Sequence, residues 1–432
     1  MEHETAQLLR LPGFRRLLGA RVLAALANAA APVLLAFAVL DIRHSAYALG
    51  VVLAARSVPQ VLLVLAGGVV ADRVSRHRVA VAALAVATLT QAGVAALVLT
   101  GTVEVWQLAA LEAVNGAATA FLMPATEALT GTSVDERLVH RAVPLVRLGV
   151  TTASVGGAAF GGLLLATTGT GWGFALDAAA FGAAAVLMAR ARGRSVEPGR
   201  EPRRTRPLDD LVDGFREFRR RRWLLVVVAQ FFVINAVLAG AWSTLGPVIA
   251  ERHLGRTGWG FVSSSLAVGM VLGGLLMLKV RVTRLLAVGV AATLLVAPSL
   301  LVLGAAPSLP ALVVAVVVGG AAIETFEIAW QTSLTQNVPE GSLSRVMAFE
   351  QFGTFAAIPV GQVLAGPVAS ALGTRSAVVC GGLLVVATSL WALSSRSVRS
   401  LERRGDGPHL PAQAHEQTDV TAKEGHAGIR PR

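Results

Sequence analysis

The segment Gly67–Val79 reads G-G-V-V-A-D-R-V-S-R-H-R-V and joins two long apolar runs through a short charged turn. Gly68 lets helix backbones approach closely, because glycine carries no side chain. Asp72 places a carboxylate at the end of the first helix, and Arg73 and Arg76 begin a basic cluster ahead of the second. The segment therefore predicts two closely packed membrane-spanning helices that meet in a charged turn at the membrane surface.

The composition of the chain is that of a membrane protein. Only 15% of its 432 residues are charged, 54% are hydrophobic and the mean hydropathy is +0.64, whereas soluble domains carry about 25% charged residues. The net charge of +12 could suggest a nucleic-acid partner, but the basic residues lie between and after apolar runs rather than along one soluble face. We therefore expect a lipid bilayer as the main partner and no nucleic acid.

Twelve apolar runs of roughly 18–27 residues are each long enough to cross about 30 Å of hydrocarbon as a helix. They cover residues 14–40, 47–71, 79–99, 106–129, 142–165, 172–189, 223–249, 259–278, 285–303, 309–331, 346–372 and 376–393. The sequence thus predicts an all-α integral membrane protein with twelve transmembrane helices in two pseudo-symmetric six-helix halves.

A polar linker divides the twelve runs into two halves. Residues 190–222 are rich in Arg and Pro, and apolar residues after Pro207 recur at helical spacing, which predicts an amphipathic helix at the membrane surface. We expect residues 1–189 to form the N-terminal six-helix half, 190–222 a cytoplasmic linker with this helix, and 223–393 the C-terminal half. Residues 394–432 are polar and predict a disordered cytoplasmic tail.

The positions of the basic residues predict the orientation of the chain. Most of the 38 Lys and Arg residues lie in one set of turns and in the terminal segments, whereas the opposite set of turns holds only Arg43, Arg252, Arg256 and Arg375. By the positive-inside rule, both termini are expected in the cytoplasm. The Arg- and Ala-rich usage suggests a GC-rich bacterial genome, so we expect a multi-pass protein of the bacterial cytoplasmic membrane.

The two halves resemble each other at a constant spacing along the chain. This spacing pairs Arg141 with Arg345, Gly149 with Gly353, Gly157 with Gly361, and Gly162 with Gly366. Together with Gly161, the glycines of the last two pairs are expected to allow close helix packing. Duplicated halves of this kind are typical of transporters that rock around a site near the bilayer midplane.

The Gly67–Val79 segment resembles the signature loop of the major facilitator superfamily, G-x-x-x-D-R-x-G-R-[RK], with Ser75 in the place of one glycine. Further stretches, taken in order, resemble the branch that includes the enterobactin exporter and macrolide efflux proteins. These stretches are Phe14–Arg21, Ala54–Pro59, Pro124–Leu129, Gly156–Leu163 and Trp330–Phe349. The resemblance implies proton-coupled efflux of a small hydrophobic compound, an antibiotic or a siderophore-like metabolite by alternating access. We expect no cofactor and a monomeric protein.

Two positions depart from this family pattern. Relatives often carry an acidic residue in the first helix, where this chain has Asn28. The drug-antiporter pattern G-P-x-x-G-G reads G-A-A-F-G-G at Gly157–Gly162, without its proline. Proton coupling and drug antiport are therefore implied by the family rather than by these residues.

The resemblance also implies a cytoplasmic latch around Asp72. A carboxylate at the C-terminal end of a helix is disfavoured by the helix dipole, so it needs compensation. The expected parts of the latch are Gly68, Arg73 and Arg76 beside Asp72, and Arg345 at the start of the eleventh helix. This latch would hold the cytoplasmic side closed while the transport cavity faces outward.

Charged residues inside the predicted spans are candidates for substrate binding or ion coupling, because each costs about 2.5–3.5 kcal/mol to insert. Glu112 and Glu324 are the candidate proton carriers, and Glu327 shares a helix face with Glu324. Arg21 and Arg56 could pair with a carboxylate or attract an anionic substrate. The sequence leaves both roles open for the two arginines.

Several uncharged residues of the spans could contact a substrate. Asn28, Gln230, Asn235 and Trp242 are candidate polar or aromatic contacts in a cavity between the halves. Asn and Gln also serve as hydrogen-bond partners between helices, so a structural role is the alternative. Asp177 lies nearer to the end of its run, where a surface pair would explain it.

Other function classes lack their sequence signals. The chain has no G-x-x-x-x-G-K-[ST] loop for an ATP-driven pump and no H-E-x-x-H motif for a zinc enzyme. Cys380 is the only cysteine, which excludes a disulfide or a thiolate metal site within one chain. The protein is therefore not expected to be an enzyme. Import or uniport of a small metabolite, and a transporter-like sensor that moves nothing, are the alternatives to efflux.

Overall fold

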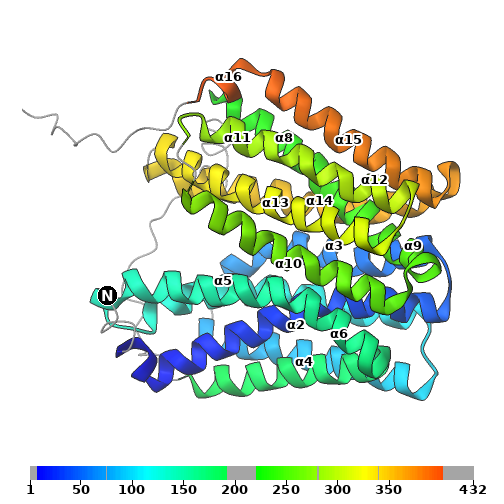
Figure 1. The fold of residues 1–432 in the computed structure, drawn as a ribbon. Helices are drawn as coiled ribbons and strands as arrows, with labels where there is room; N and C mark the ends of the chain where they lie inside the picture. Colours follow the sequence, from blue (N-terminus) through cyan, green and yellow to red (C-terminus); the bar gives the residue numbers. More distant parts are fainter. Residues whose placement is uncertain (1–6, 74, 192–219, 280–281, 339, 402–432) are drawn as a thin grey trace, which may run out of the picture.

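The computed structural model describes residues 7–73, 75–191, 220–279, 282–338 and 340–401 (Figure 1). Every regular element in these residues is a helix, and 12 helical spans are long and apolar enough to cross a membrane. The predicted all-helical fold with twelve spans is thus confirmed. The predicted amphipathic helix of the linker lies outside the described residues.

The first six spans form the N-terminal half, in the lower part of Figure 1. Its helices are α2 (Pro12–Ile42), α3 (Ala46–Arg73), α4 (Arg76–Thr100), α5 (Val105–Thr132) and α6 (Glu136–Arg190). Helix α6 contains both the fifth and the sixth span. These spans meet at Gly169, whose φ of 78° lies in the left-handed region that glycine enters at little cost.

The last six spans form the C-terminal half, in the upper part of Figure 1. Its elements are α8 (Arg222–Val237), the π-helix η1 (Leu238–Leu245), α9 (Gly246–His253), α10 (Gly255–Lys279), α11 (Leu285–Ala292), the 3-10 helix η2 (Thr293–Val296), α12 (Ala297–Ala305), α13 (Leu309–Asn337), α14 (Glu340–Leu372), α15 (Thr374–Ser394) and α16 (Arg396–Arg399). The seventh span runs through α8, η1 and α9, and the ninth through α11, η2 and α12.

Proline accounts for the irregular turns of these two spans. Pro247 lacks an N–H group and its ring clashes with the carbonyl four residues earlier, so the turns before it widen into η1. Within η1, Thr244 Oγ1 donates a hydrogen bond at 2.9 Å to the carbonyl of Ala239, five residues back. The 3-10 turn η2 likewise ends two residues before Pro298.

The bundle has two ends, which we name by residues. The Asp41 end is the end at which α2 stops and α3 begins, and it lies at the right of Figure 1 together with α9. The Arg190 end is the opposite end, at which α6 stops. The start of the described chain and α16 both lie at the Arg190 end, at the left of Figure 1.

The apolar core joins the two halves at the Asp41 end. One cluster of buried residues there contains Phe37 and Leu49 of the N-terminal half and Trp259 of the C-terminal half. At the Arg190 end, the N-terminal half has its own buried cluster around Phe181, and the C-terminal half has another around Trp330. Shared apolar packing in the described residues therefore lies at one end of the bundle.

Glycines bring helices together within and between the halves. A Cβ built at Gly157 would lie 2.7 Å from the Cβ of Ala29, and one built at Gly162 would lie 2.6 Å from the Cα of Gly260 in the other half. The remaining packing candidates also face a neighbouring helix: Gly161 faces Ala30, Gly361 faces Ala236, and Gly366 faces Tyr47. Gly157 and Gly361, which the internal repeat pairs, each pack on the first span of their own half.

The C-terminal boundary of the packed helical domain lies later in the chain than the sequence predicts. Residues 396–399, which were expected in a disordered tail, form the short helix α16. Its Val398 is fully buried in the cluster of the C-terminal half, and α16 packs against α8 and α15. Residues 402–432 of the predicted tail lie outside the described residues. The apolar Val398 thus extends the packed domain beyond the last span.

Gly156 and Gly157 test the importance of close packing, because they are neighbours on α6 with different surroundings. Nothing lies within 4 Å of a Cβ built at Gly156, whereas one at Gly157 would overlap α2. We expect Gly156→Ala to keep or raise the melting temperature in detergent, since alanine favours a helix by about 1 kcal/mol over glycine. Gly157→Ala should lower it by several degrees, because overpacking costs about 1–3 kcal/mol. Equal melting temperatures would contradict the contact between α2 and α6.

Candidate functional site

A buried ion pair lies within the N-terminal half. Arg56 Nη1 on α3 donates to Glu112 Oε2 on α5 at 2.8 Å, and Arg56 Nη2 donates to Asn28 Oδ1 on α2, also at 2.8 Å. Arg56 is 6% exposed and Glu112 is 0% exposed. The structure thus joins three of the candidates from the sequence in one hydrogen-bonded group.

The backbones of α3 and α5 come close together beside this ion pair. Gly116, one turn after Glu112, packs on the backbone carbonyl of Arg56, and a Cβ at this position would overlap that carbonyl. The glycine therefore allows the two charged residues to lie on touching helices. Because both charges are buried, losing either partner would leave the other charge uncompensated.

Further polar groups are buried in the same half. Asn115 Nδ2 on α5 donates to Thr90 Oγ1 on α4 at 2.9 Å. Gln91 on α4 is 0% exposed and Asp177 on α6 is 1% exposed. The charge of Asp177 interacts with both charges of the ion pair. Helices α2, α5 and α6 thus contribute polar side chains near Arg56, and Asn115 connects α5 with Thr90 of α4.

The interpretation of Asp177 as part of a surface pair is wrong, because its side chain is buried between helices. Distance from the end of an apolar run gives the height of a residue in the bundle, but it does not give the direction of its side chain. Asp177, Gln91 and Asn115 were therefore missed as members of the polar group. Their signal in the sequence was the presence of polar side chains inside apolar runs.

The other charged candidates have separate surroundings. Arg21 Nη1 on α2 donates to Thr130 Oγ1 on α5 at 2.8 Å. Glu324 and Glu327 lie half-buried on α13, where their charges interact. Glu327 Oε1 also accepts a hydrogen bond from Gln331 Nε2 at 3.1 Å. The candidate proton carriers Glu112 and Glu324 thus belong to different halves.

Gln230 lies in the core of the C-terminal half. Gln230 is 1% exposed, and its Nε2 donates to Thr293 Oγ1 at 2.9 Å and to Ser389 Oγ at 3.2 Å. These bonds tie the seventh, ninth and twelfth spans together. Gln230 therefore has the structural role between helices that the sequence gave as the alternative to substrate contact.

Asn235 and Trp242 lie on the seventh span and are half-buried. Asn235 Nδ2 donates to the carbonyl of Phe231, one turn earlier, at 2.8 Å. Trp242 packs on Trp259, with ring centroids 4.9 Å apart. Trp242 thus takes part in the apolar packing at the Asp41 end, and the amide of Asn235 is bonded within its own helix.

A pocket lies between the two halves. Its lining residues are Gln60 on α3, Thr119, Ala120 and Met123 on α5, and Phe355 on α14. On the side of the pocket toward the Asp41 end, Ser57 Oγ of α3 donates to Gln362 Oε1 of α14 at 2.6 Å. The pocket is therefore bounded by polar contact between the halves on one side and has a mostly apolar lining.

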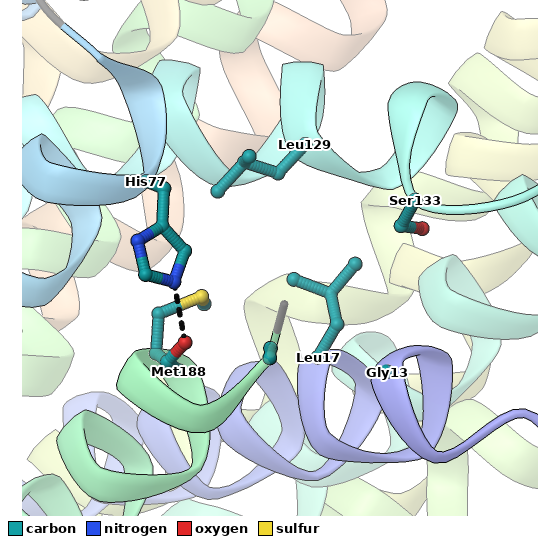
Figure 2. A pocket seen from close by; sticks show the side chains of 7 residues that line it. Gly13, Leu17, His77, Leu129, Ser133 and Met188 are labelled. Atoms are coloured by element: carbon teal, nitrogen blue, oxygen red, sulfur yellow. Dashed lines mark hydrogen bonds between the residues drawn. The ribbon is translucent and has the colours of Figure 1, made fainter. Parts of the chain in front are cut away.

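Figure 2 shows a second pocket, which lies within the N-terminal half at the Arg190 end. It is lined by Gly13, Leu17, His77, Leu129, Ser133, Met188 and Ala191. His77 Nε2 lies 2.8 Å from the carbonyl oxygen of Met188, and a carbonyl can only accept, so this ring nitrogen is the donor. The cavity volume is about 20 Å³, which suits a water molecule rather than a substrate.

An ion pair joins the halves at the Asp41 end. The guanidinium of Arg256 on α10 donates to both carboxylate oxygens of Asp41 on α2, and it also donates to Glu251 Oε1 at 3.2 Å. Thr170 Oγ1 of α6 donates to Asp41 Oδ2 at 3.3 Å. The Arg256 guanidinium also lies 5.4 Å from the ring centroid of Phe37. These contacts could not be predicted from the sequence, in which Arg256 is only one of the few basic residues in the opposite set of turns.

The predicted latch is described only in part. Arg76 begins α4 and is half-buried. Gly68, Asp72, Arg73 and Arg345 lie outside the residues whose side chains the structure describes. The latch therefore stays a prediction.

Two pseudo-symmetric halves of six spans each, with charged groups buried inside the spans, define a transporter of the major facilitator superfamily. Residues 5–429 match the family of transmembrane secretion effectors (MFS_3), and the chain belongs to this family. It is therefore a membrane transporter for a small molecule and not an enzyme, and it is a multi-pass protein of the bacterial inner membrane.

Named relatives of this chain include multidrug efflux pumps. The multidrug efflux pump Tap of Mycobacterium bovis and of Mycobacterium tuberculosis is 27% identical over 406 residues, which are 89% of this chain and 94% of the relative. The multidrug efflux pump Tap of Mycolicibacterium fortuitum is 25% identical over 398 residues, 85% of this chain and 92% of the relative. These proteins align with nearly the whole chain, so both halves are shared.

Solved structures share the fold. A bacterial homologue of the human lysosomal transporter Spinster has a TM-score of 0.70 at 16% identity, with 92% of this chain and 100% of that chain covered. The nucleoside transporter NupG has a TM-score of 0.70 at 11% identity, with 89% and 99% covered. At these identities the likeness concerns the fold alone.

Replacing one partner of the Arg56–Glu112 pair should be more damaging than replacing both. Removing one partner of a buried ion pair typically costs about 3–5 kcal/mol, whereas replacing both by apolar residues is often nearly neutral. We expect Arg56→Leu and Glu112→Leu each to lower the melting temperature, and the double variant to recover most of the loss. Arg15→Leu, at an exposed position, is the control. A double variant less stable than both single variants would refute this coupling.

Proposed function

We propose that this protein exports a small hydrophobic compound, an antibiotic or a siderophore-like metabolite from the cytoplasm, in exchange for protons, by alternating access. Membership of a family described as secretion effectors supports export. Relatives that align over most of the chain and are named multidrug efflux pumps support a small hydrophobic substrate.

The proposed orientation places the Arg190 end in the cytoplasm. The linker between the halves carries the densest run of arginines in the chain, and it leaves the bundle at this end. The positive-inside rule favours the cytoplasm for such segments. Both ends of the described chain lie at the Arg190 end as well, so both termini would be cytoplasmic.

The observation that supports alternating access is the joining of the halves at one end. Apolar packing, the Asp41–Arg256 pair and the Gly162–Gly260 contact all lie at the Asp41 end. In the proposed orientation, these contacts close the protein toward the outside. The described arrangement is then the one from which an exporter takes up its substrate and in which an importer would release it, so the direction of the proposal rests on the family and its named relatives.

The lining of the pocket between the halves supports an apolar substrate, although its volume of about 10 Å³ means that the halves must part further before a substrate fits. Met123 offers a flexible side chain that adapts to different shapes, and Phe355 offers an aromatic face. Gln60 and Thr119 add a small number of hydrogen-bonding groups. A mostly apolar lining with few polar groups is the usual composition of a site for small organic molecules.

Proton coupling and the latch belong to the same proposal. Glu112 and Glu324 are the proposed proton carriers, one in each half, and Arg56 holds Glu112 in the described arrangement. When the Asp41 end opens, the Asp72 latch would close the cytoplasmic end. Asp72→Asn should then reduce efflux without reducing the amount of protein in the membrane, and unchanged efflux would refute the latch.

Accumulation assays in a bacterial host without its own major efflux pumps test the function. Cells that express the protein should accumulate severalfold less ethidium, tetracycline or erythromycin than cells that express the Arg56→Leu/Glu112→Leu double variant, which we expect to fold but not to couple. An uncoupler should abolish the difference. Untargeted mass spectrometry of cells and medium extends the test to metabolites.

The possible results separate the alternatives. A compound that rises in the medium and falls in the cells establishes export and identifies the substrate. A compound that instead enters the cells faster would show import and refute the direction proposed here. Specific binding of a compound without any change in either pool would refute transport and favour a sensor.

The Asp41–Arg256 pair should act as part of the gate at the Asp41 end. Cysteines introduced by Ser57→Cys and Gln362→Cys in a Cys380→Ser background should be joined efficiently by a short bifunctional thiol reagent, because Ser57 Oγ and Gln362 Oε1 meet across the halves at 2.6 Å. Adding Arg256→Gln should lower the cross-linking yield, since an exposed ion pair contributes about 0.2–1 kcal/mol to closure.

Arg375→Gln is the matched control for this gate. Arg375 lies at the same end, but its Nε donates to the carbonyl of Gly304 within the C-terminal half at 2.8 Å. The control should leave the yield unchanged. Equal yields for Arg256→Gln and Arg375→Gln would contradict a role of the ion pair in closure.

A further inference from the structure

Asp177 is a buried acid that the proposed mechanism does not use. The residue is 1% exposed, and neither of its carboxylate oxygens has a hydrogen-bond partner among the described residues. An ionised carboxylate without a partner is costly to bury, whereas the protonated acid carries no charge. The surroundings of Asp177 thus suit the neutral acid.

The charges around Asp177 lead to the same conclusion by a separate argument. Arg56 supplies one positive charge, while Glu112 and Asp177 would supply two negative charges. The Arg56 guanidinium is already engaged by Glu112 and by Asn28. One bound proton on the two acids makes this buried group neutral.

The elements packed against this part of α6 supply no second cation to the group in the described residues. Helix α4 contributes Thr90 and Gln91, which are uncharged. On α2, the Arg21 guanidinium donates to Thr130, and on α10, Arg256 is paired with Asp41 at the Asp41 end. The remaining charged residues of these helices lie near the helix ends.

We propose that Asp177 is a proton-binding site of this protein and that it holds its proton while Arg56 is paired with Glu112. The proposal rests on the proposed function only in naming the proton as the coupling ion. In the step itself, the carboxylate of Asp177 takes up one proton to become a carboxylic acid, and no electron is transferred. The net charge of the three groups changes from one negative charge to none.

Release of this proton would have a consequence for Arg56. Two carboxylates would then compete for one guanidinium, and a shift of Arg56 toward Asp177 would weaken its hydrogen bond to Asn28. Asn28 is half-buried on the first span, whereas Asp177 is buried on the sixth. The guanidinium therefore links the protonation of Asp177 to a residue on another span of the same half.

Infrared difference spectroscopy of the full-length protein in lipid tests the site directly, because a carboxylic acid and a carboxylate absorb at different frequencies. In a pH titration, the wild type should show a carboxylic acid band that disappears at alkaline pH. Asp177→Asn should lack this band. Asp135→Asn makes the same chemical change at the exposed N-cap of α6 and should keep it, since Asn caps a helix as well as Asp does.

A second measurement guards against misfolding. Asp177→Asn resembles the protonated acid in shape and charge, so its melting temperature at neutral pH should match that of the wild type. Asp177→Glu retains an ionisable group and should retain a titrating band at a shifted position. A large loss of stability in Asp177→Asn would indicate an ionised, paired Asp177 and would overturn the proposal.

The results separate this proposal from the proposed function. A band that persists in Asp177→Asn would overturn the proton site at Asp177. Efflux of ethidium, tetracycline or erythromycin that stops with an uncoupler would still support proton-coupled export. Conversely, the band could be lost in Asp177→Asn while efflux by the wild type is unaffected by an uncoupler. That result would support the proton site and refute proton coupling of efflux.

Discussion

Close contact between helix backbones is the constraint on which the rest of the structure depends. Lipid tails are as apolar as the helices, so no hydrophobic effect draws one span toward another, and association relies on packing. Glycines bring α2 to α6 and α3 to α5 in this protein. The contact at Gly116 places Arg56 and Glu112 on touching helices, so charges that are costly to insert singly can pair. The buried polar group is thus a consequence of the glycine pattern.

The same kind of contact joins the halves at the Asp41 end. Gly162 and Gly260 meet through their backbones, and Gly366 meets Tyr47. Such contacts need close approach over a whole helix face, so they are lost together when the halves separate, which favours two distinct arrangements over gradual opening. The Asp41–Arg256 pair is more than one third exposed on each side, so water can replace its partners when it breaks.

The spans and the family could be predicted from the sequence, because twenty apolar residues in a row have few alternatives to a membrane helix. Arg56, Glu112 and Asn28 could also be selected as candidates, since polar groups inside spans are costly. Their partnership could not be predicted, because it depends on which helices touch and on how each is rotated. Gln230 shows the same limit: its hydrogen bonds to Thr293 and Ser389 follow from packing within one half.

The structure also accounts for part of the high positive charge. The last carbonyls of a helix lack partners within the helix, and a cation is favoured at that end. Arg16 Nη1 donates to the last carbonyl of α6, at Arg190, at 3.0 Å, and Arg221 donates to the carbonyl of Asn337 at the end of α13. At the Asp41 end, Arg375 donates a hydrogen bond to the carbonyl of Gly304 at the end of α12, and Arg256 pairs with Asp41. Two of the four basic residues that depart from the positive-inside pattern therefore have structural partners. Helix termination therefore accounts for some of the arginines behind the net charge of +12.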